Sequence, residues 1–169
     1  MKELRGSWRF LGGLFLALLF LCMLSLPTMA ADKAELFGGY QYGWNPGGSG
    51  NGWEGAITGK LNRWFGITGD VSGLYGGGAS GYTFMAGPTI SAGAGGVKPF
   101  VHALFGGVHA SGFGFSGNGF AAAVGGGVDF RIAPHLAVRA PQVDWMLFHG
   151  GGGTAAKNVR VSAGIVLRF

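Results

Sequence analysis

The C-terminal stretch of the chain, where apolar residues recur at every second position, most narrows the possible folds. The apolar row runs from Val159 to Phe169, and the positions between its members include Arg160, Ser162 and Arg168. This period is typical of a β-strand with two different faces, because successive side chains point to opposite sides of a sheet. A soluble sheet would bury the apolar row, whereas a transmembrane barrel would turn it toward lipid and the polar row into its lumen.

Seven earlier segments carry the same alternation. It is clear in residues 53–61, 65–73 and 119–130, and fainter in residues 35–42, 82–90 and 98–107. In residues 136–147 the apolar row moves by one position near Pro141, which predicts a β-bulge there, since a bulge restores the row and frees proline from donating a ladder hydrogen bond. That bulge would turn Arg139, Gln142 and Asp144 inward together. The segments predict an all-β fold, an eight-stranded antiparallel up-and-down transmembrane β-barrel.

Glycine-rich connections separate the segments, in a chain that holds 37 glycines. The connections are predicted at residues 44–51, 62–63, 76–80, 92–96, 108–118, 132–134 and 148–157. We expect the even-numbered connections to be the shorter ones and to lie on the side of both termini, as is usual in transmembrane barrels.

The N-terminus predicts a secretory leader. Lys2, Arg5 and Arg9 precede an apolar run over residues 11–26, and a small residue follows at Ala30. This order is that of a signal peptide, and the run is shorter than the roughly twenty residues of a membrane-spanning helix. We expect residues 1–30 to be a cleaved signal peptide and residues 31–169 to form one barrel domain; an uncleaved helical anchor is the alternative.

Charge and cysteine content exclude several kinds of site. The only cysteine lies in the leader, so no disulfide framework or thiolate site is expected in the domain. Residues 31–169 hold nine Lys or Arg and six Asp or Glu, a balance that does not favour a nucleic-acid partner.

The charged residues of the clearer segments fall on the less apolar face, which would be the lumen, and the predicted bulge turns those of residues 136–147 to the same side. They are four acidic and four basic residues: Glu54, Lys60, Asp70, Asp129, Arg139, Asp144, Arg160 and Arg168. An eight-stranded barrel is only wide enough inside for side chains, and buried charges must be paired. We therefore expect a structural lumen network; a catalytic or conducting array is the alternative.

Aromatic residues gather near the expected strand ends. Those assigned to membrane-interface girdles are Trp44, Trp53, Trp64, Tyr75, Tyr82, Trp145 and Phe169. Carbohydrate stacking is the alternative role for these rings.

Catalysis has one candidate, the pair His109 and Ser111, because outer-membrane lipid A deacylases use a His-x-Ser pair with a carboxylate. The pair begins a glycine-rich connection far in sequence from any acidic residue. The remaining histidines, His102, His135 and His149, show no metal-ligand spacing. No catalytic residue, metal site or cofactor is expected.

The last strand resembles the C-terminal signal by which outer-membrane barrels are assembled. The matching positions are Ser162, Gly164, Ile165, Leu167 and Phe169. Residues 98–104, 125–130 and 136–139 resemble the small OmpA-like outer-membrane β-barrel family. The resemblance implies residence in the cell outer membrane, with its lipid and lipopolysaccharide as neighbours and the barrel assembly machinery as a partner during insertion.

The expected function is a structural or surface-interaction role by a monomeric barrel without catalysis. A narrow pore or small-solute transporter is the first alternative, in which Arg139, Arg160 and Arg168 would favour anions. A lipid A-modifying enzyme and a soluble periplasmic lipid-binding barrel are the others; the latter requires apolar residues inside and charges outside.

Overall fold

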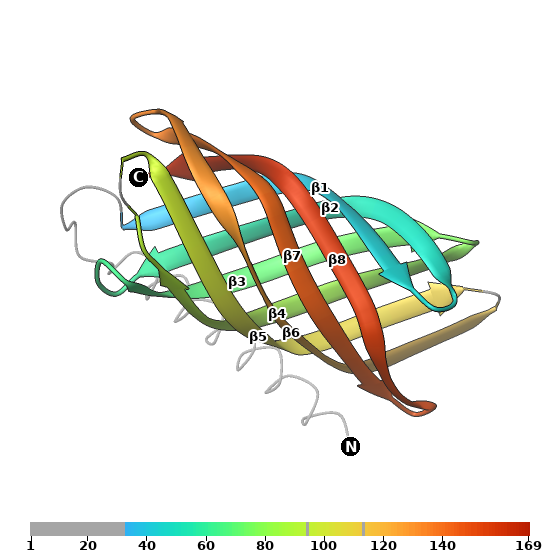
Figure 1. Ribbon diagram of the computed structural model, residues 1–169. Coiled ribbons are helices and arrows are strands. Elements are labelled where there is room, and N and C mark those ends of the chain that lie inside the picture. The colour runs from blue at the N-terminus through green and yellow to red at the C-terminus, as the bar shows by residue number, and fades with distance from the viewer. Residues whose placement is uncertain (1–32, 94, 113) are drawn as a thin grey trace, which may run out of the picture. The chain divides into compact units, whose positions relative to one another are not determined.

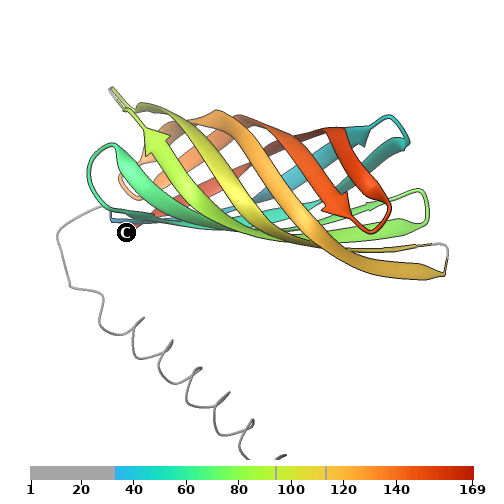
Figure 2. The ribbon, with the colours of Figure 1, turned by 90° about the horizontal axis from the view of Figure 1, so that it is seen from below.

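Residues 33–93, 95–112 and 114–169 are described by a computed structural model, so the expected leader lies outside the described residues. Eight strands are hydrogen-bonded in sequence order, and the last pairs with the first to close a barrel (Figures 1 and 2). They are β1 (Ala34–Asn45), β2 (Gly48–Lys60), β3 (Phe65–Gly76), β4 (Ala79–Ser91), β5 (Val97–Gly112), β6 (Phe115–Ala133), β7 (Leu136–Gly150) and β8 (Gly153–Arg168). All neighbouring pairs are antiparallel, which confirms the predicted fold class.

The apolar rows face outward. In β8, Val161 and Leu167 are each 40% exposed, whereas Arg160 and Arg168 are 2% and 3% exposed. Similar apolar side chains cover the outer face of the other strands, and every Asp and Glu side chain of the described residues is buried inside. This orientation is the one of a transmembrane barrel and the inverse of a soluble lipid-binding barrel.

The predicted bulge in β7 is present. Between Arg139 and Gln142 the register of β7 shifts against β8, and the β6–β7 register shifts at the same level. Ala140 and Pro141 therefore both lie on the outer side, and the residues on either side of them point inward. The extra residue brings Arg139, Gln142 and Asp144 into the lumen, where they are at most 6% exposed.

The predicted connections were wrong at the barrel end that carries the β1–β2, β3–β4, β5–β6 and β7–β8 hairpins, here called the hairpin end (right in Figure 1). Residues 44–51, 108–118 and 148–157 are mostly strand, and each of the four hairpins has only two residues between its strands. Positive φ angles at Gly77 and Gly78, 59° and 80°, suit the tight turn between β3 and β4. At the opposite, terminal end the connections at residues 61–64 and 92–96 are longer, so the expected length asymmetry is reversed.

Glycines allow the first and last strands to approach closely. A Cβ atom added at Gly39 would lie 2.5 Å from the carbonyl oxygen of Ala163 in β8, whereas one added at the neighbouring Gly38 would meet nothing within 4 Å. Gly39 faces inward next to Gly164, its partner across the β1–β8 seam. A side chain at Gly39 would therefore push against the backbone that closes the barrel.

We expect Gly39→Ala to lower the free energy of unfolding by about 1–3 kcal/mol through overpacking at the seam. The measurement is the urea midpoint of the full chain refolded in detergent micelles. Gly38→Ala is the matched control, with an expected change within about 0.5 kcal/mol. Equal midpoints for the two variants would contradict the role assigned to Gly39.

Candidate functional site

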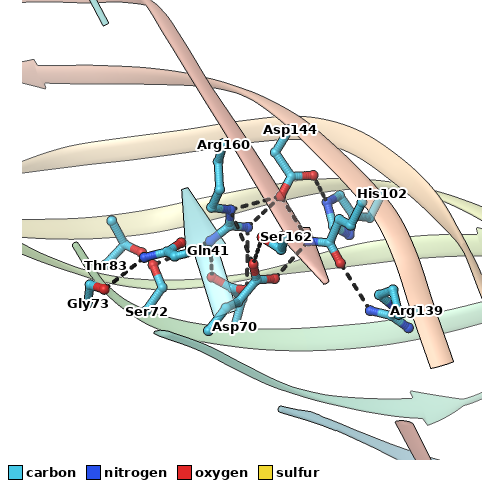
Figure 3. A network of polar contacts seen from close by, with 12 residues as sticks. Gln41, Asp70, Ser72, Gly73, Thr83, His102, Arg139, Asp144, Arg160 and Ser162 are labelled. Carbon is cyan, nitrogen blue, oxygen red and sulfur yellow. Dashed lines mark hydrogen bonds and ion pairs between the residues drawn. The ribbon is translucent and has the colours of Figure 1, made fainter. Parts of the chain in front are cut away.

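The most elaborate polar site of the described chain is a layer of side chains across the barrel lumen (Figure 3). The structure places all eight charged residues of the expected lumen set inside the barrel, seven of them at most 6% exposed. The eighth, Lys60, lies nearer the terminal end with its side chain 18% exposed. We call this set, with the polar residues that bond to it, the lumen network.

Arg160 lies at the centre of the lumen network and contacts three carboxylates from three other strands. Its Nη2 donates to Asp144 Oδ2 at 2.7 Å and its Nη1 donates to Asp70 Oδ1 at 3.1 Å. Its Nε lies 3.5 Å from Glu54 Oε2. One guanidinium thus ties β8 to β7, β3 and β2, and it is itself 2% exposed.

The same carboxylates receive further donors from neutral side chains and from a histidine. Gln142 Nε2 donates to Glu54 Oε1 at 2.7 Å and to Asp144 Oδ2 at 2.9 Å. His102 Nε2 lies 2.7 Å from Asp144 Oδ1, and the Ser162 hydroxyl donates to Glu54. Buried carboxylates need these hydrogen bonds and ion pairs because an unpaired buried charge costs several kcal/mol.

Arg139 forms a second centre toward the terminal end. Its Nε donates to Asp129 Oδ1 at 2.7 Å, and Asp129 Oδ2 also accepts from Arg168 Nη2 at 3.3 Å. The guanidinium carbon lies 4.6 Å from the centre of the Phe37 ring and 4.1 Å from that of Phe100. Two aromatic faces and one carboxylate therefore hold this arginine.

Glu35 closes the terminal end of the lumen network. Its Oε1 lies 2.9 Å from Lys60 Nζ, 2.7 Å from Lys98 Nζ and 3.0 Å from Arg168 Nε. Three cations thus share one carboxylate. This local excess of positive charge is offset by the three carboxylates that surround Arg160. Across the whole network five acidic residues face five Lys or Arg residues.

The expected lumen set lacked Glu35, Lys98 and His102, which lie in β1 and β5. Both strands carry only faint alternation, so the face of these residues was not assigned. The alternation within β5 could have identified two of them. Lys98 and His102 occupy even positions, whereas the exposed Val97 and Val101 occupy odd positions of the same strand. Every second position therefore faces the lumen.

Almost no empty space remains inside the lumen network. The hollow bordered by Glu54, Asp70, Asp129, Arg139 and Gln142 has a volume of about 10 Å³. A cavity needs about 10–15 Å³ to hold one water molecule. The side chains therefore nearly close the lumen at this level, leaving room for about one water molecule.

Several solved β-barrel structures have the same architecture. Neisserial surface protein A is 16% identical with a TM-score of 0.66, and the match covers 83% of this chain and 100% of that chain. The N-terminal β-barrel domain of Pseudomonas aeruginosa OprF is 12% identical with a TM-score of 0.62 and the same coverage. Ail of Yersinia pestis is 16% identical with a TM-score of 0.52, again with the same coverage. The chain has the fold of the eight-stranded outer-membrane β-barrels.

The likeness confirms the resemblance to small OmpA-like barrels at the level of the fold. A de novo designed transmembrane β-barrel matches as well, at 14% identity and a TM-score of 0.54, covering 82% of this chain and 97% of the design. No model of a protein family and no curated protein matches the chain. Since a designed barrel shares the fold, the fold itself assigns no activity.

The expected girdle residues all reach the outer surface of the barrel. The tryptophans among them, Trp44, Trp53, Trp64 and Trp145, are 44–53% exposed. Near the hairpin end, Trp53 Nε1 donates to the Tyr75 hydroxyl at 3.4 Å, which donates to the Tyr82 hydroxyl at 3.1 Å. At the terminal end the Arg63 guanidinium lies 4.6 Å from the centre of the Trp64 ring. Both ends thus present rings with polar partners, as membrane interfaces favour.

The candidate catalytic pair does not meet a carboxylate. His109 Nδ1 lies 2.6 Å from Asn118 Oδ1, and Ser111 Oγ lies 2.9 Å from Ser80 Oγ. The Asp and Glu side chains of the described residues are all enclosed in the lumen. Among these residues no group of three His, Cys, Asp or Glu side chains is arranged to hold a metal ion.

We expect Arg160→Met to lower the free energy of unfolding by about 3–5 kcal/mol, because it leaves buried carboxylates without their cation. Urea unfolding of the full chain refolded in micelles measures this loss. Lys157→Met removes an exposed cation of β8 and should change stability by no more than about 0.5 kcal/mol. If Arg160→Met unfolded at the same urea midpoint as the unmodified chain, the ion pairs of Arg160 would contribute little to stability.

Proposed function

We propose that this protein resides in the cell outer membrane as a monomeric barrel with a structural or surface-interaction role and a closed lumen. The observation that carries the proposal is the lumen network, which fills the cross-section and leaves a hollow of about 10 Å³. The exposed apolar face and the aromatic rings at both ends support residence in a bilayer.

Membrane lipid and lipopolysaccharide are the neighbours that the outer surface suits. The described residues keep all their carboxylates inside, whereas Lys33, Arg63, Arg131 and Lys157 are exposed. No Asp or Glu side chain of the described residues therefore repels anionic head groups from the rim of the barrel. The two-residue turns of the hairpins leave little surface for a protein partner. Contact with the outside is therefore limited to the ends of the four hairpins.

Phe169 and the residues alternating before it support insertion by the barrel assembly machinery. Phe169 is 65% exposed, and Ile165 and Leu167 lie in line with it on the outer face of β8. Ser162 and Gly164, which precede Ile165, face the lumen. The terminal ring is thus free for recognition before the β1–β8 seam closes.

Deleting Phe169 should strongly reduce insertion in cells. The measurement is the heat-modifiable band on gels of outer-membrane fractions, where an unboiled folded barrel migrates apart from the boiled chain. Phe169→Tyr, which keeps the terminal ring, is the matched control and should retain the band. An undiminished folded band after deletion would remove Phe169 from the assembly signal, and unmodified chain in the soluble periplasm would overturn the proposal.

The pore alternative predicts current through the same lumen. We expect no steady single-channel conductance from the purified full chain in planar lipid bilayers, because the lumen network leaves no continuous water path. Discrete openings whose anion selectivity falls in Arg139→Gln or Arg168→Gln would instead establish a narrow pore. Openings with unchanged selectivity would place the current outside this path.

A further inference from the structure

Positively charged side chains line a hollow at the terminal end of the barrel, the end near the C label in Figure 1. The hollow has a volume of about 180 Å³. The strands β2, β5, β6 and β8 contribute its charged side chains, which are Lys60, Lys98, Arg131 and Arg168. Its other borders are Val97 and glycines of the β4–β5 connection, so no acidic residue of the described chain lines it.

Positive charge exceeds negative charge at this end of the lumen. Glu35 and Asp129 are its acidic residues, and their cationic partners are Lys60, Lys98, Arg139 and Arg168. Arg131 adds another cation, and neither Arg131 nor the C-terminal carboxylate of Phe169 takes part in an ion pair between described residues. The carboxylates that balance this surplus surround Arg160, farther along the lumen. An anion at the terminal end would therefore meet a net positive charge.

The two lysines have donors to spare. Lys98 Nζ donates to Glu35 Oε1 and Oε2 at 2.7 and 2.8 Å, and Lys60 Nζ lies 2.9 Å from the same Oε1. An ammonium group carries three N–H donors, so each lysine keeps at least one that Glu35 does not use. The side chains of Lys60 and Lys98 are 18% and 14% exposed and both line the hollow. Their ammonium groups are thus accessible to an acceptor that enters it.

The hollow is open to water at the rim of the barrel. Gly93, Gly95 and Arg131 are exposed, and glycine has no side chain that would cover the opening. One molecule of liquid water takes up about 30 Å³, so a hollow of about 180 Å³ has room for a phosphate group without displacement of a side chain. Because the lysines are largely buried, salt screens their charges less than it screens those of surface residues.

We propose that this hollow binds a phosphate group, held by Lys60, Lys98 and Arg131. A tetrahedral phosphate offers acceptors in several directions, which suits cations that arrive from different strands. Arginine also pairs with two phosphate oxygens through parallel N–H groups. The site goes beyond the proposed structural role and does not depend on it, because a phosphate at the rim leaves the lumen network closed.

Phosphate groups reach this rim from two sources. Phe130, the neighbour of Arg131, is 44% exposed on the outer face, and interfacial aromatic rings lie at the level of the lipid head groups. A lipid phosphate can therefore meet Arg131 at the rim. Inorganic phosphate and soluble phosphate esters enter from the water, and the same cations would hold either kind of group.

The test is calorimetric titration of the full chain with inorganic phosphate in dodecyl maltoside micelles, which contain no phosphate, at constant ionic strength. We expect saturable binding, and we expect Arg131→Gln to weaken it about tenfold because a charge-assisted contact is lost. Arg63→Gln is the matched control. It removes an exposed cation at the same end, where the guanidinium lies 4.6 Å from the centre of the Trp64 ring, and should bind phosphate as the unmodified chain does.

Lys60→Gln tests the buried side of the site and should also weaken binding about tenfold. Arg131 is exposed, so Arg131→Gln keeps the test decisive if Lys60→Gln fails to fold. Absence of saturable binding to the unmodified chain would overturn the proposal. Equal weakening by Arg131→Gln and Arg63→Gln would overturn it too, because net charge rather than the hollow would then attract the anion.

A competition experiment distinguishes the two sources. Dioleoyl phosphatidylglycerol is added to the micelles before the phosphate titration, with dioleoylglycerol, which lacks the phosphate, as the control lipid. Loss of inorganic phosphate binding with the phospholipid alone would support the phosphate site and identify a lipid head group as its ligand. Unchanged binding with both lipids would support the site and identify a soluble phosphate.

Discussion

The pairing of buried charges in the lumen is the constraint on which the rest of the barrel depends. Arg160 can remain buried only while Glu54, Asp70 and Asp144 surround it, and those carboxylates come from three different strands. Each contact fixes the height of one strand against another, because a shift of one residue would turn the charge toward the outer face. The network therefore specifies register across the whole barrel as well as filling it.

The irregularities of β7 follow from this constraint. Without the bulge at Pro141, Arg139 and Asp144 would lie on opposite faces, and one of them would be carried into the apolar outer surface. A charge there costs about 2–4 kcal/mol at the centre of a bilayer. With the bulge, Arg139 reaches Asp129 at 2.7 Å and Asp144 reaches Arg160 at 2.7 Å. One inserted residue thus keeps both ion pairs inside.

Alternation was sufficient to predict the fold and the faces of the charged residues in β2, β3, β6, β7 and β8. It could not predict partners, because Arg160 and Asp70 are 90 residues apart and meet only across the closed barrel. It failed at the hairpins for a different reason. Beyond the bilayer neither face of a strand needs an apolar row, so residues 108–118 continue the β-ladder while the pattern that identifies a strand disappears.

A cavity of about 260 Å³ near the hairpin end, lined by Leu74, Val108, Met146 and Phe148, was not predicted from the sequence. Its apolar side chains lie at lumen-facing positions, where the charged residues of the other half had set the expectation of polarity. Phe148 was placed in a connection, whereas in the structure it packs against the buried cluster of Met85, Leu104 and Met146. The lumen is thus divided along its axis. Ion pairs close the terminal half, whereas apolar side chains such as Leu74, Val108 and Met146 line much of the hairpin half.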